Sequence, residues 1–132
     1  MTNDVTLLVA RVLLALLFVV SGLGMLSAPS GMAGYFASIG IPLAGLVVWL
    51  VIALKVLGGL ALVAGFQTKW AAYGLAAFSV ATAFIGHFDF ADQMQSAIFM
   101  KNLGLAGGFL ALSVAGPGAL SVDARRGGLA YA

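Results

Sequence analysis

The sequence predicts an all-α integral membrane protein: a bundle of four transmembrane helices with a short interfacial helix between the first two spans. Only 8% of the residues are charged and 63% are hydrophobic, with a mean hydropathy of +1.15. Soluble domains carry about 25% charged residues, so this chain cannot build a water-facing surface. Its apolar residues form runs of roughly 20, the length that crosses a bilayer. The 132 residues leave room for a single membrane domain of four spans and for no separate soluble domain.

The apolar runs place the four spans at residues 5–27, 43–66, 70–87 and 96–115. A break at Pro29 ends the first span, and Pro42 is expected to open the second in its first turn. Residues 30–40 are too few to cross the bilayer. They carry adjacent aromatic rings at Tyr35 and Phe36, which suits a helix in the membrane interface.

The fourth span has a sequence signal for its start. Asp92 is followed three residues later by Gln95, a spacing that resembles a capping box and predicts a helix beginning near Gln93.

The charges outside the spans predict the orientation. Four spans bring both termini to one side, together with Lys69, Arg125 and Arg126, whereas Asp89 and Asp92 lie on the other side. Because positive residues concentrate on the cytoplasmic side, we expect both termini in the cytoplasm.

Composition also excludes several functions. The chain has no cysteine, which removes disulfides, thiolate catalysis and iron–sulfur clusters. A net charge of +2 without a basic tract gives no reason to expect a nucleic-acid partner. No nucleophile with an adjacent base, no phosphate-binding loop and no metal-ligand set is recognisable. We therefore predict no catalytic residues and no metal, and expect no enzymatic activity from the isolated chain.

Lys55 stands near the middle of the second span, where a charge costs about 2.5–3.5 kcal/mol on insertion scales. No acidic residue lies within any predicted span to pair with it. Three solutions are open. The amine is uncharged, or it bonds to backbone or to Ser79 and Thr82, or it holds an anionic or carbonyl-bearing ligand. For Arg11, the other charge deep in a span, the structural alternative to a ligand is snorkelling toward lipid phosphates.

A second polar group is expected near the outer ends of the last two spans. Lys101 and Asn102 lie two turns inside the fourth span, at about the depth where His87 leaves the third. The three residues are either a ligand site or a network of inter-helix hydrogen bonds. His87 also lies close in sequence to Asp89 and Asp92, so a proton relay or an interfacial histidine without a ligand are further readings.

Small residues within the spans predict close helix contacts, because they let helix backbones approach in lipid. The helix-packing candidates are Gly58, Gly59, Gly104 and Gly108.

Taken in order along the chain, a set of short motifs resembles the DoxX family of small bacterial membrane proteins. The motifs are Arg11, Phe18 and Ser21-Gly22; Gly40-Ile41-Pro42; Gly58-Gly59-Leu60; the stretch 65–69; His87; Lys101-Asn102 with Gly107-Gly108; Gly116-Pro117-Gly118; and Ser121-Val122-Asp123.

The resemblance implies four transmembrane helices in a bacterial inner (cytoplasmic) membrane. Members of the family are linked to membrane redox assemblies, including a subunit type of thiosulfate:quinone oxidoreductase. This chain departs from the family at two positions: Met25 stands where relatives often have a lysine, and Lys55 where they often have a glutamate.

Three functions are compatible with these observations. The first is a non-catalytic or cofactor-binding subunit of a redox assembly, which holds a quinone or another lipophile. The second is a membrane scaffold that docks a partner. The third is a small homodimeric transporter or anion channel. Expected partners are membrane lipids and either a second copy or a membrane or peripheral redox partner. The candidate ligand-binding residues are Lys55, Arg11, His87, Lys101 and Asn102.

Overall fold

The computed structural model describes residues 2–127, which form helices joined by short turns, so the all-α prediction is confirmed. The helices are α1 (Thr2–Leu26), α2 (Pro29–Ser38), α3 (Ala44–Ala64), α4 (Thr68–Gly86), α5 (Gln93–Ala115) and α6 (Val122–Arg125). Within the described range, α1, α3 and α5 are long and apolar enough to cross a membrane. Helix α4 has 19 residues and is not among these candidates, so its role as a fourth span stays a prediction.

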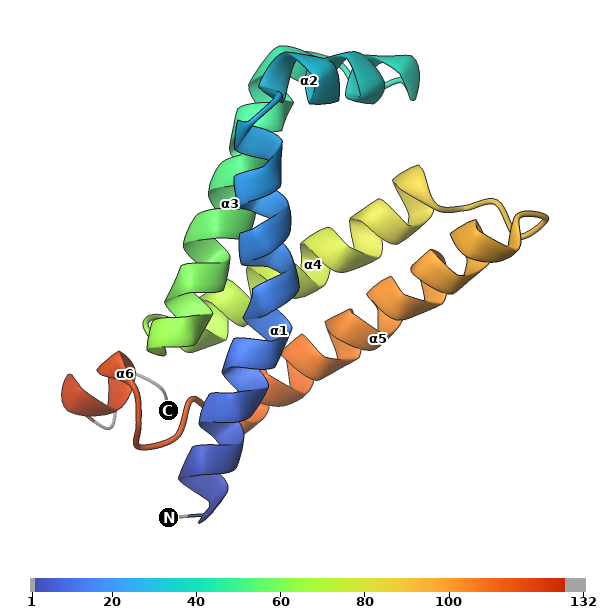
Figure 1. The fold of residues 1–132 in the computed structure, drawn as a ribbon. Helices are drawn as coiled ribbons and strands as arrows, with labels where there is room; N and C mark the ends of the chain where they lie inside the picture. The colour runs from blue at the N-terminus through green and yellow to red at the C-terminus, as the bar shows by residue number, and fades with distance from the viewer. Residues whose placement is uncertain (1, 128–132) are drawn as a thin grey trace.

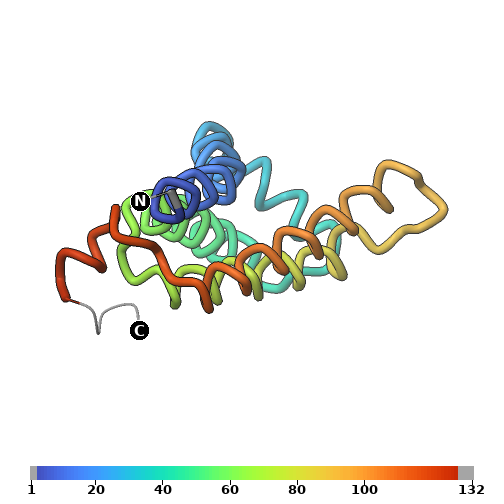
Figure 2. The backbone as a smooth tube through the Cα atoms, turned by 90° about the horizontal axis from the view of Figure 1, so that it is seen from below, coloured from blue at the N-terminus to red at the C-terminus, as the bar shows by residue number. Residues whose placement is uncertain are grey.

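The long helices are arranged as two pairs that diverge. Helix α1 packs along α3, and α4 packs along α5. The pairs meet at the end of the molecule that holds the start of α1, the α3–α4 turn and α6, and they separate toward the other end (Figures 1 and 2). Helix α2 lies across the far ends of α1 and α3 (Figure 1). This is the orientation of a helix that lies in the plane of a membrane.

The turns before and after α2 agree only in part with those predicted from the sequence. The Ser27 hydroxyl donates to a carbonyl of the last turn of α1, and Pro29 is the first residue of α2, which its fixed φ favours. The prediction for Pro42 is wrong, because α3 begins only at Ala44. Leu43 separates the two residues in a left-handed conformation with φ of 51°, which a helix cannot contain.

Helix α5 begins at the predicted residue, Gln93. The Asp92 carboxylate accepts hydrogen bonds from the backbone N–H groups of Met94 at 2.9 Å and Gln95 at 3.3 Å, as an N-cap residue does. The reciprocal half of a capping box is not formed, because the Gln95 side chain bonds to His87 instead.

The core lies where the two pairs meet. Phe18 of α1 packs edge-on against Phe78 of α4 and Phe109 of α5, with ring centroids 6.3 and 5.5 Å apart. Leu62 and Leu75, both fully buried, complete the centre of this cluster. One aromatic side chain of α1 therefore joins the two pairs.

Glycines set the close approach of α1 and α3. A Cβ at Gly22 would lie 2.7 Å from Cγ2 of Val56, and a Cβ at Gly59 would lie 2.6 Å from Cγ2 of Val19. Neither position can hold a larger residue unless the helices move apart. The predicted packing role of Gly59 is therefore matched by its contacts.

The other glycines that were predicted to pack between helices differ in their neighbours. Gly58 faces Leu75 of α4, and Gly108 faces Leu14 of α1, 3.1 Å from the position of an added Cβ. Gly104 is exposed and meets nothing within 4 Å among the described residues, so its packing role stays a prediction.

We predict that Gly59→Ala destabilises the protein by about 1–3 kcal/mol, since Val19 is β-branched and cannot rotate away from the added methyl group. Gly104→Ala is the matched control, and its stability should be unchanged or higher, because alanine favours a helix more than glycine does. Unfolding midpoints in mild detergent measure both. Equal midpoints for Gly59→Ala and the parent would contradict the packing.

The end of the molecule where the pairs meet is held by Arg11. Its side chain is fully buried, with 0% of its surface exposed. Nη1 donates to the carbonyl oxygens of Leu62 and Val63, each at 3.2 Å, and Nη2 donates to that of Leu120. The expectation that Arg11 snorkels toward lipid is therefore wrong. Carbonyl oxygens at the end of α3 and in the C-terminal segment accept from both terminal nitrogens of the guanidinium, whereas Nε is buried without a hydrogen-bond partner among the described residues.

Asp123 completes the same structure. Its carboxylate accepts from the backbone N–H groups of Gln67 at 2.8 Å and Thr68 at 2.9 Å, and so caps the start of α4. Its own N–H donates to the carbonyl of Gly65 at 2.9 Å, and its charge interacts with Arg11. Gly65 is in the left-handed region with φ of 73°, and a Cβ there would overlap Arg11.

We predict that Arg11→Met lowers stability by about 1.5–3 kcal/mol, because buried carbonyls lose hydrogen bonds from a charged donor. Asp123→Asn should act in the same direction, since an amide cannot accept from both N–H groups of the α4 start. Arg125→Gln, on the exposed side of α6, should leave the midpoint unchanged. If Arg11→Met and Asp123→Asn both unfold at the parent midpoint in detergent, Arg11 and Asp123 do not hold this end of the molecule together.

Candidate functional site

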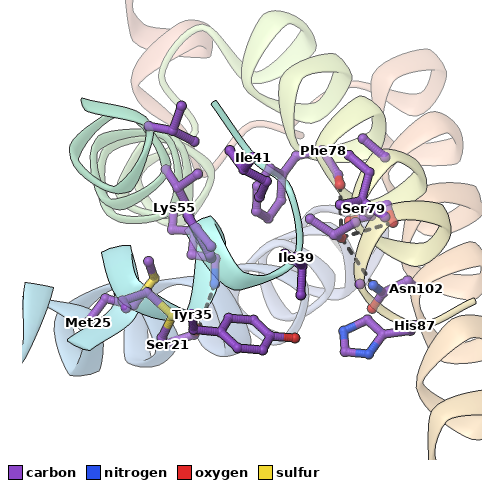
Figure 3. Close-up of a pocket in the computed structure, with 18 of the residues that line it drawn as sticks. Ser21, Met25, Tyr35, Ile39, Ile41, Lys55, Phe78, Ser79, His87 and Asn102 are labelled. Carbon is purple, nitrogen blue, oxygen red and sulfur yellow. Dashed lines mark hydrogen bonds between the residues drawn. The ribbon is translucent and has the colours of Figure 1, made fainter. Parts of the chain in front are cut away.

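A cavity of about 870 Å³ lies between the two helix pairs, beneath α2, and every helix from α1 to α5 contributes to its wall. Most of the wall is apolar. Figure 3 shows Lys55 and Ser21 on one side of the cavity, and His87 and Asn102 on the opposite side. The Tyr35 ring, from α2, reaches between them. The apolar lining residues include Leu17, Phe18, Met25, Met32, Phe36, Val51, Phe78, Ile85 and Ile98.

Lys55 reaches this cavity from α3. Its Nζ donates to Oγ of Ser21 on α1 at 2.8 Å and lies 5.6 Å from the centroid of the Phe78 ring. An ammonium group carries three N–H donors, and this single hydroxyl satisfies one. The side chain is half-buried, so its other donors face the cavity.

The hydroxyl partners predicted for Lys55 were wrong. Ser79 donates to the carbonyl of Leu75 at 2.8 Å, and Thr82 donates to that of Phe78 at 2.9 Å, both within α4. Hydroxyls in helices often bond back in this way to the preceding turn. Both nevertheless line the cavity.

Asn102 lies on the far wall and links α5 to α4. It is buried, and its Nδ2 donates to Oγ1 of Thr82 at 3.1 Å. One N–H of the amide is used in this bond, while the amide borders the cavity. Asn102 therefore combines the two roles weighed from the sequence: it joins two helices and supplies a polar group to the wall.

His87 follows α4 and lines the outer part of the cavity. Its Nδ1 is 2.6 Å from Oε1 of Gln95. In the tautomer that donates from Nδ1, Nε2 carries a lone pair. The neighbouring carboxylates have other partners: Asp89 accepts from the N–H of Ala91, and Asp92 caps α5. The partner of His87 is thus an amide and not a carboxylate, which removes the basis for the predicted relay.

The charges of the wall are all positive. Lys55 and Lys101 both line the cavity and interact electrostatically. Among the lining residues that the structure describes, none is Asp or Glu. Arg11, by contrast, lies outside the cavity, at the closed end of the molecule. The cavity therefore unites four of the five predicted ligand-binding residues.

Comparison with known proteins decides the family. The family model described as DoxX matches residues 6–88. The chain is 44% identical to the inner membrane protein YqjF of Escherichia coli K12 over 92% of each chain. It is 34% identical to the inner membrane protein YphA of the same strain, over 93% of this chain and 91% of the relative. The chain belongs to the DoxX family. It is an integral inner-membrane protein, and no solved structure matches it.

Within this DoxX protein, the match contains Lys55 and His87, while Lys101 and Asn102 lie beyond it. Both positions that depart from the family pattern border the cavity, namely Met25 and Lys55. The departures thus change the wall of the cavity and leave the closed end untouched.

Sequence reasoning missed two polar groups of the cavity, those of Ser21 and Tyr35, as lining residues. Ser21 was visible only as part of a family motif, and Tyr35 only as an interfacial aromatic. Between residues 2 and 127, no group of His, Asp or Glu is arranged to hold a metal ion. The site is thus a set of hydrogen-bonding groups in an apolar wall.

We predict that Asn102 and Thr82 are coupled by about 0.6 kcal/mol, the average for an inter-helix hydrogen bond in a membrane protein. A double-mutant cycle with Asn102→Leu and Thr82→Val, measured by unfolding in detergent, gives this value directly. Strictly additive effects of the two substitutions would contradict the bond.

Proposed function

We propose that this DoxX protein binds a lipophilic molecule with a polar head in the cavity between its helix pairs. In this proposal the chain is a single membrane domain with four spans at 5–27, 43–66, 70–87 and 96–115, in which α4 is the third span. Both termini lie in the cytoplasm. The protein serves as a non-catalytic or cofactor-binding subunit of a bacterial membrane redox assembly, and a quinone is the first candidate ligand.

The observation that carries this proposal is the composition of the cavity. Ligand pockets measure about 300–1,000 Å³ and combine apolar walls with a few polar groups that orient the ligand. The cavity here has about 870 Å³, and its polar groups stand on two opposite sides. A molecule with two carbonyl groups across a flat ring can accept from Lys55 on one side and from the Asn102 side on the other.

The apolar part of such a ligand also has a place. Below α2 the wall is formed by Met25, Met32, Phe36 and Val51, where a hydrocarbon chain replaces lipid contacts. Lys55 and the Asn102 side bind the polar head, so the ligand does not bind in the reversed orientation. Any electron transfer then depends on the ligand and on a partner protein.

A second candidate function, a scaffold that docks another helix, is favoured by the open face of α5. Gly104 and Gly107 on this face meet nothing within 4 Å, and small residues are typical of helix–helix contacts in membranes. The third function, a homodimeric anion pathway, has the positive wall in its favour. We rank both below ligand binding, since neither uses the opposed polar groups.

Purified protein in nanodiscs should carry an extractable lipophile or bind added ubiquinone or menaquinone with a saturable isotherm. Lys55→Met and His87→Ala should each weaken that binding at least about tenfold, the equivalent of about 1.4 kcal/mol, because each removes one polar contact to the head. Lys69→Met is the matched control, a lysine at the α3–α4 turn outside the cavity.

No lipophile on extraction together with no binding on titration would refute the ligand proposal. In that case, cross-linking in the native membrane separates the alternatives: a recovered partner supports the scaffold. Flux of small anions into proteoliposomes supports the anion pathway.

A further inference from the structure

The charged residues around the cavity limit the kind of ligand more narrowly than the shape of the cavity does. Two lysines, Lys55 from α3 and Lys101 from α5, line the same cavity, and their charges interact. Like charges repel most where water is scarce. No carboxylate among the described lining residues offsets them, and charged residues within membrane proteins pair with opposite charges or border a wet cavity.

The hydrogen-bond donors of these side chains also lack partners. Lys55 has one neutral partner, the Ser21 hydroxyl, for its three N–H donors. Lys101 is exposed on α5 and has no acidic partner within 4 Å among the described residues. Asn102, the next residue, uses one N–H toward Thr82 and has a second available. The described lining residues thus offer positively charged donors and no negatively charged acceptor.

We propose that the cavity selects an amphiphile with an anionic head, a carboxylate or a phosphate, which bridges Lys55 and Lys101 while its alkyl chain lies against the apolar wall below α2. This inference rests on the proposed binding of a lipophile in the cavity, and it puts an anionic amphiphile in place of the quinone as the first candidate. An anion satisfies two ammonium groups at once, whereas a neutral carbonyl head leaves their repulsion in place. A cationic head adds a third positive charge and is rejected.

The position of Lys55 gives this chain the proposed selectivity for an anionic head. Ser21 holds the ammonium group at the α1 side of the cavity, and the face of Phe78 lies on its other side at 5.6 Å. The side chain is therefore directed into the cavity. An anionic head bound there has the apolar wall below α2 beside it for its alkyl chain.

The test compares probes that share one alkyl chain. Protein in phosphatidylcholine nanodiscs is titrated with dodecanoate, dodecanol and dodecyltrimethylammonium, with empty nanodiscs as the blank and isothermal titration calorimetry as the readout. Dodecanoate should bind at least tenfold more tightly than dodecanol, and the ammonium probe should bind most weakly. Lys55→Met and Lys101→Met should each reduce that preference to below threefold while dodecanol affinity stays within a factor of two. Lys69→Met should keep the parent preference.

Two further arms identify the source of the anion. Acetate at the same concentrations should not compete with dodecanoate, and acetate that competes equally would overturn the amphiphile. Phosphatidylglycerol added to the nanodiscs should compete if the natural head is a lipid phosphate, and should have no effect if it is a free carboxylate; either result supports an anionic amphiphile.

Equal affinities for dodecanoate and dodecanol would overturn the anionic head and leave lipophile binding intact. Absence of binding by any of the probes, and by quinones, would overturn both proposals. Because Lys101 is exposed, Lys101→Met is expected to fold even where Lys55→Met does not. Unchanged selectivity in Lys101→Met would contradict the bridge on its own.

Discussion

The rest of the structure depends on the burial of one guanidinium group. Arg11 stands in α1, yet its hydrogen bonds go to the carbonyls of Leu62, Val63 and Leu120, so one side chain joins the first helix, the end of the third and the C-terminal segment. The carbonyls at a helix end carry a partial negative charge, which stabilises the buried cation together with the charge of Asp123. Asp123 extends the structure to the start of α4. The two helix pairs are thus fixed to each other at one end.

The same arrangement explains why the other end is open. Between the pairs, α3 packs against α4, and Phe18 of α1 contacts rings of both α4 and α5. Beyond that point the pairs diverge, and α2 covers part of the opening (Figure 1). A space between diverging apolar helices is filled by lipid or by a ligand, because an empty volume of this size forfeits the contacts of every residue around it. The opposed polar groups of Lys55 and Asn102 favour a ligand with a head and a chain.

Much of the fold could be predicted because it depends on local signals. Apolar length located the long helices, Pro29 located the break before α2, and Asp92 located the start of α5. Most of the errors have one cause: the residue or carbonyl that decides the contact is distant in the chain. The acceptors of Arg11 lie 51 to 109 residues away, and the partner of Lys55 lies 34 residues away, so no local pattern reveals them. Leu43 was hidden for another reason, since nothing about leucine indicates a left-handed residue. Four of the five ligand residues nevertheless meet in one cavity, because intramembrane polar residues are costly and are retained where they have partners.

The claim on which this account depends is that the cavity is occupied in the membrane by a molecule with a polar head. Native mass spectrometry of the protein, released gently from its own membrane, tests it most directly. The account predicts one adduct of lipophile mass on the parent chain and on Lys69→Met, and its loss from Lys55→Met. A parent chain that emerges bare, or an adduct that is equally abundant on Lys55→Met, would contradict it.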